Sequence, residues 1–168
     1  MIFGKHIDNL RKLYVDQLEH LHSAETQIAE ALPGMIEKAA SPELKHALQT
    51  HLEETRELVS RLEQILREST GKVEPRKNKP IDAILSEGDD MLGAASNEAV
   101  RDAAIIAAGQ RIEHYEIAAY GAVRDFAGII GEHNQAELLA KTLEEEKNAD
   151  ATLTSISNAA NTKADRAA

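Results

Sequence analysis

The sequence contains no cysteine and no tryptophan, and only 3% of its 168 residues are aromatic. Without cysteine the chain can form no disulfide, no thiolate zinc site, no iron–sulfur cluster and no catalytic thiol. Aromatic side chains are enriched in strands, so their scarcity argues against an all-β fold. A composition of 42% hydrophobic and 29% charged residues is that of one folded globular domain.

Basic residues are outnumbered, with 19 Lys and Arg against 29 Asp and Glu, which gives a formal net charge of −10. This charge opposes binding to nucleic acid or to an anionic membrane surface, because both need clustered basic side chains. Long apolar runs are missing too, and the polar amino terminus lacks the apolar core of a signal peptide. We therefore expect a cytoplasmic protein with neither a nucleic-acid nor a membrane partner.

Apolar residues recur at steps of three and four in four long segments, which is the pattern of amphipathic helices. The predicted helices cover residues 7–36, 42–70, 97–130 and 136–156. Ser41 and Asn97 are suited to cap two of them, and Gly71 to end the second. A polar connection over 71–80 and a short helix over 81–92 separate the second long helix from the third.

This order predicts two helical hairpins joined by a crossover that is long enough to run the length of the molecule. The expected fold is all-α: a ferritin-like four-helix bundle whose crossover, between its second and third long helices, carries the short extra helix. Residues 1–160 would form this single domain. Residues 161–168 would form a frayed tail.

Acidic residues interrupt the apolar faces of all four predicted long helices, although a buried carboxylate is costly unless it is paired or binds a cation. If the two hairpins turn near residues 40 and 132, counting from the turns places these acids at one height. A layer of this kind, with carboxylates from four helices, is typical of di-iron and di-manganese proteins, and carboxylate with imidazole suits iron or manganese. The candidates are Glu25, Glu54, Glu113, Glu116, Glu146 and Asp150, with His51 as a further ligand.

Other interpretations of these side chains stay open at this point. Any single acid on a charged helix is more often solvated or ion-paired, and His22 and His51 are as well explained as satisfied histidines at the edge of the core. The three tyrosines are best interpreted as core phenols. Two literal Glu-x-x-His pairs exist, and we set both aside because Glu43 belongs to the first turn of a helix and Glu19 points away from the apolar face.

Four stretches of sequence, in this order, resemble the YciE/YciF family of small bacterial ferritin-like proteins. They are Tyr14–Leu18 with His22–Gln27, His51–Thr55, Arg111–Gly121, and Leu143–Lys147 with Asp150. The resemblance covers about residues 5 to 157. It implies a ferritin-like bundle, commonly dimeric and linked to stress responses, with a dinuclear metal centre and no established reaction.

The resemblance implies metal ligands at Glu25, Glu54, Glu113, Glu116 and Glu146, with His51 and Asp150 as further candidates. The sequence departs from the wider ferritin-like Glu-x-x-His pattern, because Glu57 follows Glu54 and Ala149 follows Glu146 at the third position.

Two functions fit these observations. The first is a di-iron or di-manganese oxidoreductase that reacts with oxygen or peroxide, and the second is a structural or metal-sequestering bundle protein without turnover. Two iron ions are the expected cofactor and manganese is the alternative. We also expect a homodimer, because four isoleucines of the third long helix are unlikely all to face one core: Ile105, Ile106, Ile129 and Ile130.

Overall fold

The computed structural model describes residues 6–74 and 76–167, and within these residues it contains five helices and no strand. The predicted all-α class is confirmed. The helices are α1 (Leu10–Lys38), α2 (Pro42–Thr70), α3 (Lys79–Ala94), α4 (Glu98–Ile129) and α5 (His133–Asp165).

The ends of the helices follow local capping chemistry. Asn9 adopts extended backbone angles and its side chain accepts a hydrogen bond from the Lys12 amide, so α1 begins at Leu10 and not at Ile7. Asn97 caps α4 in the same way, as predicted. Gly71 ends α2 with a φ of 77°, a left-handed conformation that other residues rarely adopt.

Helix α5 is longer at both ends than the sequence pattern predicted. It begins at His133 and continues to Asp165, although its last buried residue is Leu153. Of the segment expected to fray, residues 161–165 are thus helical, and fraying in solution stays a prediction.

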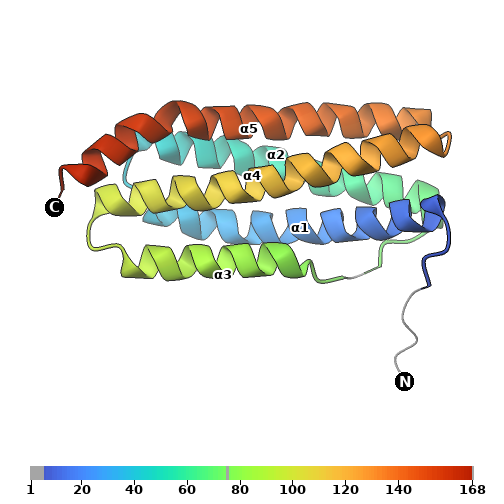
Figure 1. Cartoon of the computed structure of the whole chain (residues 1–168), viewed down its shortest axis with the longest axis horizontal. Coiled ribbons are helices and arrows are strands. Elements are labelled where there is room, and N and C mark those ends of the chain that lie inside the picture. The colour runs from blue at the N-terminus through green and yellow to red at the C-terminus, as the bar shows by residue number, and fades with distance from the viewer. Residues whose placement is uncertain (1–5, 75, 168) are drawn as a thin grey trace, which may run out of the picture.

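The four long helices pack as two hairpins (Figure 1). Helix α1 packs on α2 and α4 packs on α5, while α1 also contacts α4 and α2 contacts α5. Because α3 and its flanking loops return the chain along the length of the molecule, α2 and α4 run parallel. The helical crossover therefore lies where the sequence predicted it.

Helix α3 packs against α4 and α1 and covers a second face of α4. A Cβ atom at Gly88 of α3 would lie 3.3 Å from the Cβ of Ala108, so this glycine permits close packing of the two helices. Ile105 and Ile106 are consequently both buried within one chain, at 0% and 2% exposure. This corrects part of our argument for a dimer, and of the large apolar residues on α4 only Ile129 is strongly exposed, at 74%.

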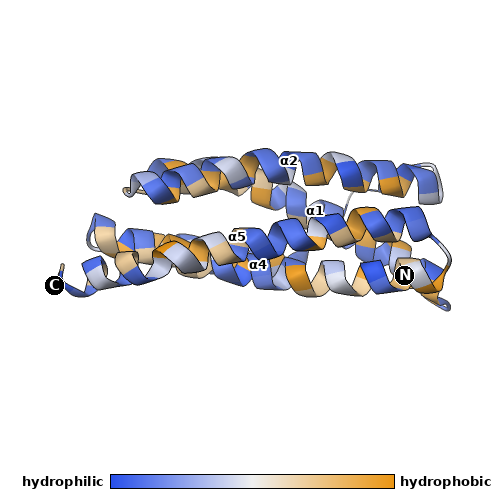
Figure 2. Cartoon of the chain, turned by 90° about the horizontal axis from the view of Figure 1, so that it is seen from above, coloured by the Kyte–Doolittle hydropathy of each residue, from blue (hydrophilic) through white to orange (hydrophobic). Residues whose placement is uncertain are grey.

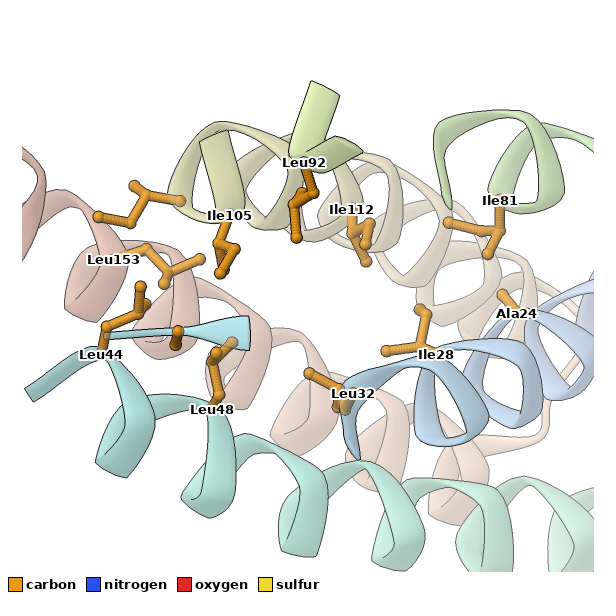
Figure 3. Packing of buried hydrophobic residues seen from close by; sticks show 12 residues of the cluster. Ala24, Ile28, Leu32, Leu44, Leu48, Ile81, Leu92, Ile105, Ile112 and Leu153 are labelled. Carbon is orange, nitrogen blue, oxygen red and sulfur yellow. The ribbon is translucent and has the colours of Figure 1, made fainter. Parts of the chain in front are cut away.

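The core consists of two apolar clusters at opposite ends of the long helices. One contains Ile28, Leu32, Leu48, Ile112 and Leu153, which Figure 3 shows converging from four helices. The other lies toward the turn between α4 and α5 and is built around Tyr14, Leu62, Tyr120 and Leu139. Between the two clusters, at mid-height, lies a layer of buried acids.

Hydrophilic and hydrophobic residues alternate along the four long helices (Figure 2). No helix in the part of the chain described by the structure has an apolar stretch long enough to cross a membrane.

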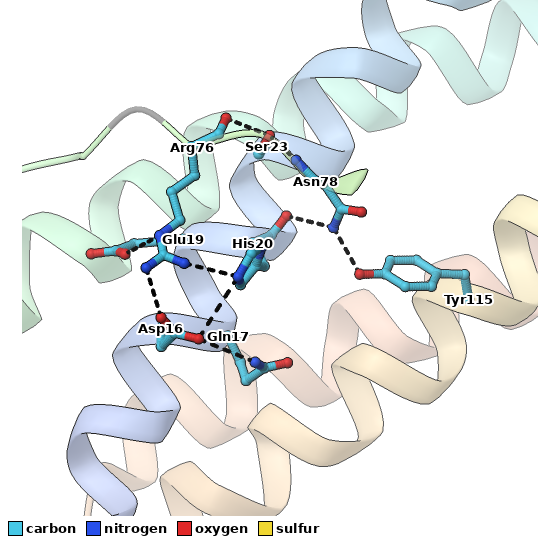
Figure 4. A network of polar contacts seen from close by, with 8 residues as sticks. All are labelled: Asp16, Gln17, Glu19, His20, Ser23, Arg76, Asn78 and Tyr115. Atoms are coloured by element: carbon cyan, nitrogen blue, oxygen red, sulfur yellow. Dashed lines mark hydrogen bonds and ion pairs between the residues drawn. The ribbon is translucent and has the colours of Figure 1, made fainter. Parts of the chain in front are cut away.

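The crossover is held to α1 by a polar network (Figure 4). Arg76 pairs through Nη2 with Asp16 at 2.9 Å and through Nε with Glu19 at 3.1 Å, and both acids are buried. Asn78 donates to the Tyr115 hydroxyl at 2.7 Å and so joins the crossover to α4. Glu19 does point away from the core face of α1, as we expected. It is nevertheless buried, because the crossover covers it.

Candidate metal centre

Four of the predicted ligands meet at mid-height of the molecule. They are His51 from α2, Glu113 and Glu116 from α4, and Glu146 from α5, and one ligand atom from each lies within 4.8 Å of all the others. The three glutamates are 2%, 0% and 1% exposed, and His51 is 9% exposed. Each belongs to the same face as the buried apolar residues of its helix, because all follow the same spacing of three and four.

Most polar atoms of this cluster have no hydrogen-bond partner among the described residues. The atoms are His51 Nε2, Glu113 Oε2, both carboxyl oxygens of Glu116, and Glu146 Oε1. Buried polar atoms are nearly always hydrogen-bonded, since an unsatisfied one costs about 1 to 3 kcal/mol. A hard cation would satisfy carboxylate oxygens and an imidazole nitrogen together, so the donor set fits iron or manganese.

Glu25 of α1 adjoins the cluster from a fourth helix. It is 1% exposed, and its charge adds to desolvation in raising the pKa of the neighbouring Glu116. The hydroxyl of Tyr120 donates a hydrogen bond of 2.5 Å to Glu25 Oε1. Tyr120 is the core phenol that the sequence predicted, and it also orients a candidate ligand, which we did not predict.

Burial raises the pKa of every acid in this layer, because a charged carboxylate loses its hydration there. Desolvation, together with neighbouring acids, raises the pKa of Glu113 to about 8, and those of Glu116 and Glu146 well above the usual 4.5. The pKa of Glu25 rises to about 7 because desolvation outweighs the hydrogen bond from Tyr120. The acids thus keep protons near neutral pH that a bound cation would displace.

Burial lowers the pKa of His51 to about 4, so its imidazole is neutral at physiological pH. A neutral imidazole is the form that binds metals. His51 Nε2 lies 3.2 Å from Glu113 Oε1, which places its unpartnered nitrogen at the edge of the carboxylate layer.

The other predicted ligands lie around the cluster and not within it. Glu54 is exposed on α2 at the edge of a cleft beside α5, although desolvation and the charge of Glu145 still raise its pKa. Asp150 is half-buried, and one of its oxygens lies 3.5 Å from Nε2 of the exposed His114. The second histidine left open, His22, lies 3.5 Å from Glu63 and outside the cluster.

One basic side chain reaches the neighbourhood of the layer. Arg61 of α2 donates to Glu145 at 2.6 Å and to the Thr142 hydroxyl at 2.5 Å, and so joins α2 to α5 beside Glu146. Its charge also lowers the pKa of Glu25, although desolvation dominates there. Sequence analysis missed Arg61 and the role of Tyr120. The spacing of four between Glu116 and Tyr120 could have indicated the second, since it places both on one face of α4.

Comparison with known proteins places the chain among bacterial proteins of the same size. A family model described as "Domain of unknown function (DUF892)" matches residues 9–166. Protein YciF of Escherichia coli (strain K12) is 35% identical over 161 residues, which are 95% of this chain and 97% of YciF.

Three solved structures have the same fold. The E. coli stress protein YciF superposes with a TM-score of 0.88 at 32% identity, over 94% of this chain and 99% of that one. YcfI of Rhodopseudomonas palustris, provisionally described as a structural protein, superposes with a TM-score of 0.87 at 36% identity, over 91% of this chain and 98% of that one. A protein from Xanthomonas campestris superposes with a TM-score of 0.77 at 21% identity, over 93% of this chain and 96% of that one, and supports the fold alone.

Proposed function

Because this chain belongs to the DUF892 family, to which the resemblance to YciF already pointed, we propose that it is a stress-response protein that binds two iron ions between its long helices. In this proposal the four long helices form a ferritin-like bundle, with residues 1–160 as its single domain. Manganese is the alternative metal.

The observation that supports this proposal best is the set of unpartnered, buried ligand atoms contributed by α2, α4 and α5. His51, Glu113, Glu116 and Glu146 would hold metal, and Glu25 would join them from α1. Glu54 and Asp150 lie around this group and bring the number of nearby carboxylates to six, which is enough for two ions. Ferrous iron bound here would supply electrons for the reduction of oxygen or peroxide.

The chain's own residues would prepare the centre for the metal. The apolar clusters on both sides keep the side chains of the layer buried, which strengthens every interaction between a cation and the carboxylates. Tyr120 orients Glu25 through its hydroxyl proton, and the neutral His51 presents a free nitrogen. Each acid must release its proton as the metal binds, so metal affinity rises with pH.

A second candidate function is a structural or metal-sequestering protein without turnover. The description of the R. palustris relative favours it, and so does the missing Glu-x-x-His pair after Glu54 and Glu146. The two candidates share the metal site and differ in chemistry. Single-turnover oxidation of the Fe(II)-loaded protein by oxygen or peroxide separates them, because only the oxidoreductase consumes the oxidant at a defined ratio to iron.

Thermal melts with chelator and with Fe(II) or Mn(II) test the metal site. Metal at one hundred times its dissociation constant stabilises the fold by about 2.7 kcal/mol, which for a chain of this length raises Tm by about 5 to 10 °C. Glu113→Gln removes one buried ligand and should lose most of this rise. The matched control is Glu137→Gln, at an exposed position of α5.

The control should keep the full metal-dependent rise in Tm. Equal rises in wild type and Glu113→Gln would refute the ligand assignment, and no rise in wild type would refute the metal site.

The proposed homodimer is tested separately, and the exposed Ile129 is the observation that still supports it. Sedimentation showing only an 18 kDa species would exclude the dimer. The cytoplasmic location stays a prediction.

A further inference from the structure

A cleft of about 380 Å³ opens between α1, α2, α4 and α5 on the side of the carboxylate layer that faces the turn between α1 and α2. Its walls are mostly apolar and include Ile28, Leu32, Leu48, Ile112 and Leu153, which converge from all four helices in Figure 3. Pockets of roughly 300 to 1,000 Å³ with apolar walls typically bind small molecules.

Two polar groups line the inner part of this cleft. His51 and Glu113 both border it, and each has a buried ligand atom, Nε2 and Oε2, that makes no hydrogen bond with any described residue. A molecule in the cleft thus meets apolar side chains along its length and two unpartnered polar atoms at one end. In the metal-free protein such a combination orients a bound molecule, because a polar end group would satisfy those atoms.

The charges around the cleft limit the kind of molecule that fits. Glu43, Glu54 and Glu113 line it, and its described lining contains no lysine or arginine. An anionic group such as a fatty-acid carboxylate would find no cation to pair with and would be repelled by the acids. The complementary molecule therefore carries no negative charge.

The dimensions of the cleft limit the size and shape of its occupant. Its lining follows α2 from Glu43 to Glu54, which at 1.5 Å per residue is about 16 Å. A helix of that length, about 10 Å in diameter, would fill on the order of 1,000 Å³. The cleft holds about 380 Å³, which is too little for a helix from a second copy and enough for one slender molecule.

We propose that this cleft binds one small, elongated, apolar molecule that carries no negative charge and whose hydrogen-bonding end group faces His51 and Glu113. A medium-length aliphatic alcohol has the required chemistry. The role of this molecule as a substrate of the metal centre rests on the function proposed above, whereas its binding to the cleft does not.

Binding is measured on the full chain in the presence of chelator, so that the result does not depend on metal. The uncharged fluorescent dye N-phenylnaphthylamine should bind saturably with one site per chain, and decanol should displace it. Decanoate has the same chain length but a negative charge, and it should displace the dye at least tenfold more weakly. Absence of saturable dye binding, or equal displacement by decanol and decanoate, overturns the proposal.

Two substitutions that fill the cleft from opposite walls locate the site. Ala47→Phe on α2 and Ala149→Phe on α5 both place a large side chain in the lining, and either should weaken dye binding at least tenfold. Ala118→Phe, at an exposed position of α4 outside the cleft, is the matched control and should bind as wild type. Circular dichroism and cooperative thermal unfolding in chelator show that each variant is folded. Unchanged dye binding in both folded cleft variants overturns the assignment.

Hydrogen exchange of the wild-type protein provides a readout that does not depend on any variant. Decanol should slow exchange of amides in residues 43–54 and 148–156, which form the α2 and α5 walls. Protection confined to other segments overturns the proposal. A protein that binds decanol in these walls but gains no stability from metal would refute the proposed function and leave the cleft assignment standing.

Discussion

Four buried carboxyl groups should make the unfolding free energy of the metal-free protein fall as pH rises. Glu25, Glu113, Glu116 and Glu146 all have raised pKa values in the folded state, chiefly through desolvation. In the unfolded chain the same groups ionise at about 4.5, so near neutral pH the folded state binds more protons than the unfolded one. Stability is then greatest at low pH and declines until each folded-state pKa is passed.

The pH range must exclude the opposite contribution of His51. Burial lowers the pKa of this imidazole to about 4, whereas in the unfolded chain the pKa is about 6.5. Below pH 6.5 the unfolded chain therefore binds the extra proton, and His51 lowers the stability of the fold only there. Between pH 6.5 and 9 the acids dominate. Each pKa unit corresponds to about 1.4 kcal/mol, so with a folded pKa of about 8, Glu113 alone contributes a loss of about 2 kcal/mol across this range. The other three acids add to this loss.

Urea denaturation in chelator at pH 6.5, 7.5, 8.5 and 9 measures this loss. Glu113→Gln removes one ionisable group and weakens the repulsion on its neighbours, so its stability should fall less steeply with pH. The control Glu137→Gln, at an exposed position, should follow wild type. Stability that stays constant or rises from pH 6.5 to 9, or an unchanged slope in Glu113→Gln, would refute the buried carboxylate layer.

Two further predictions concern side chains whose contacts the sequence pattern did not predict. Arg76→Ala removes an ion-pair partner of two buried acids on α1 and should lower the unfolding free energy by about 3 kcal/mol in urea denaturation. The neighbouring Lys77→Ala, at an exposed position, should change it by less than about 0.5 kcal/mol. A loss equal to that of the Lys77 variant would contradict the anchoring of the crossover. Tyr120→Phe removes the hydroxyl that donates to Glu25, which should cost about 1 to 2 kcal/mol and steepen the decline of stability between pH 6.5 and 9. The control Tyr14→Phe loses an equally buried hydrogen bond, from its hydroxyl to Gln135 outside the layer. It should lower the unfolding free energy by a similar amount without changing how steeply stability falls with pH. Equal slopes of stability against pH in the two variants would refute the pairing of Tyr120 with Glu25.

Several features of this protein were predictable from sequence because they depend on local periodicity. The spacing of apolar residues indicated four long helices, and Asn97 and Gly71 marked two of their ends by capping chemistry. The common height of the acids was predictable as well. A helix rises by a constant amount per residue and each hairpin turn is short. Counting from a turn near residue 132 places Glu113 level with residue 151 and Glu116 level with residue 148, within one helical turn of Glu146 and Asp150.

Helix rotation was not predictable to the accuracy that the site needs. His51 and Glu54 are three residues apart, which separates them by about 60° around α2, and both adjoin the apolar face. The structure turns His51 into the layer and leaves Glu54 exposed at the cleft. A rotation of this size is decided by the packing of α2 against α1 and α5 together, which no local pattern in α2 contains.

Contacts between distant segments were decided by tertiary structure alone. Glu19 lies off the core face of α1, yet it is buried because the crossover brings Arg76 over it. Ile105 and Ile106 are both buried because α3 covers the second face of α4, and no spacing within α4 reveals that cover. Spacing along one helix records which of its residues share a face. What that face meets depends on the packing free energy of the whole chain, to which residues far apart in sequence contribute equally.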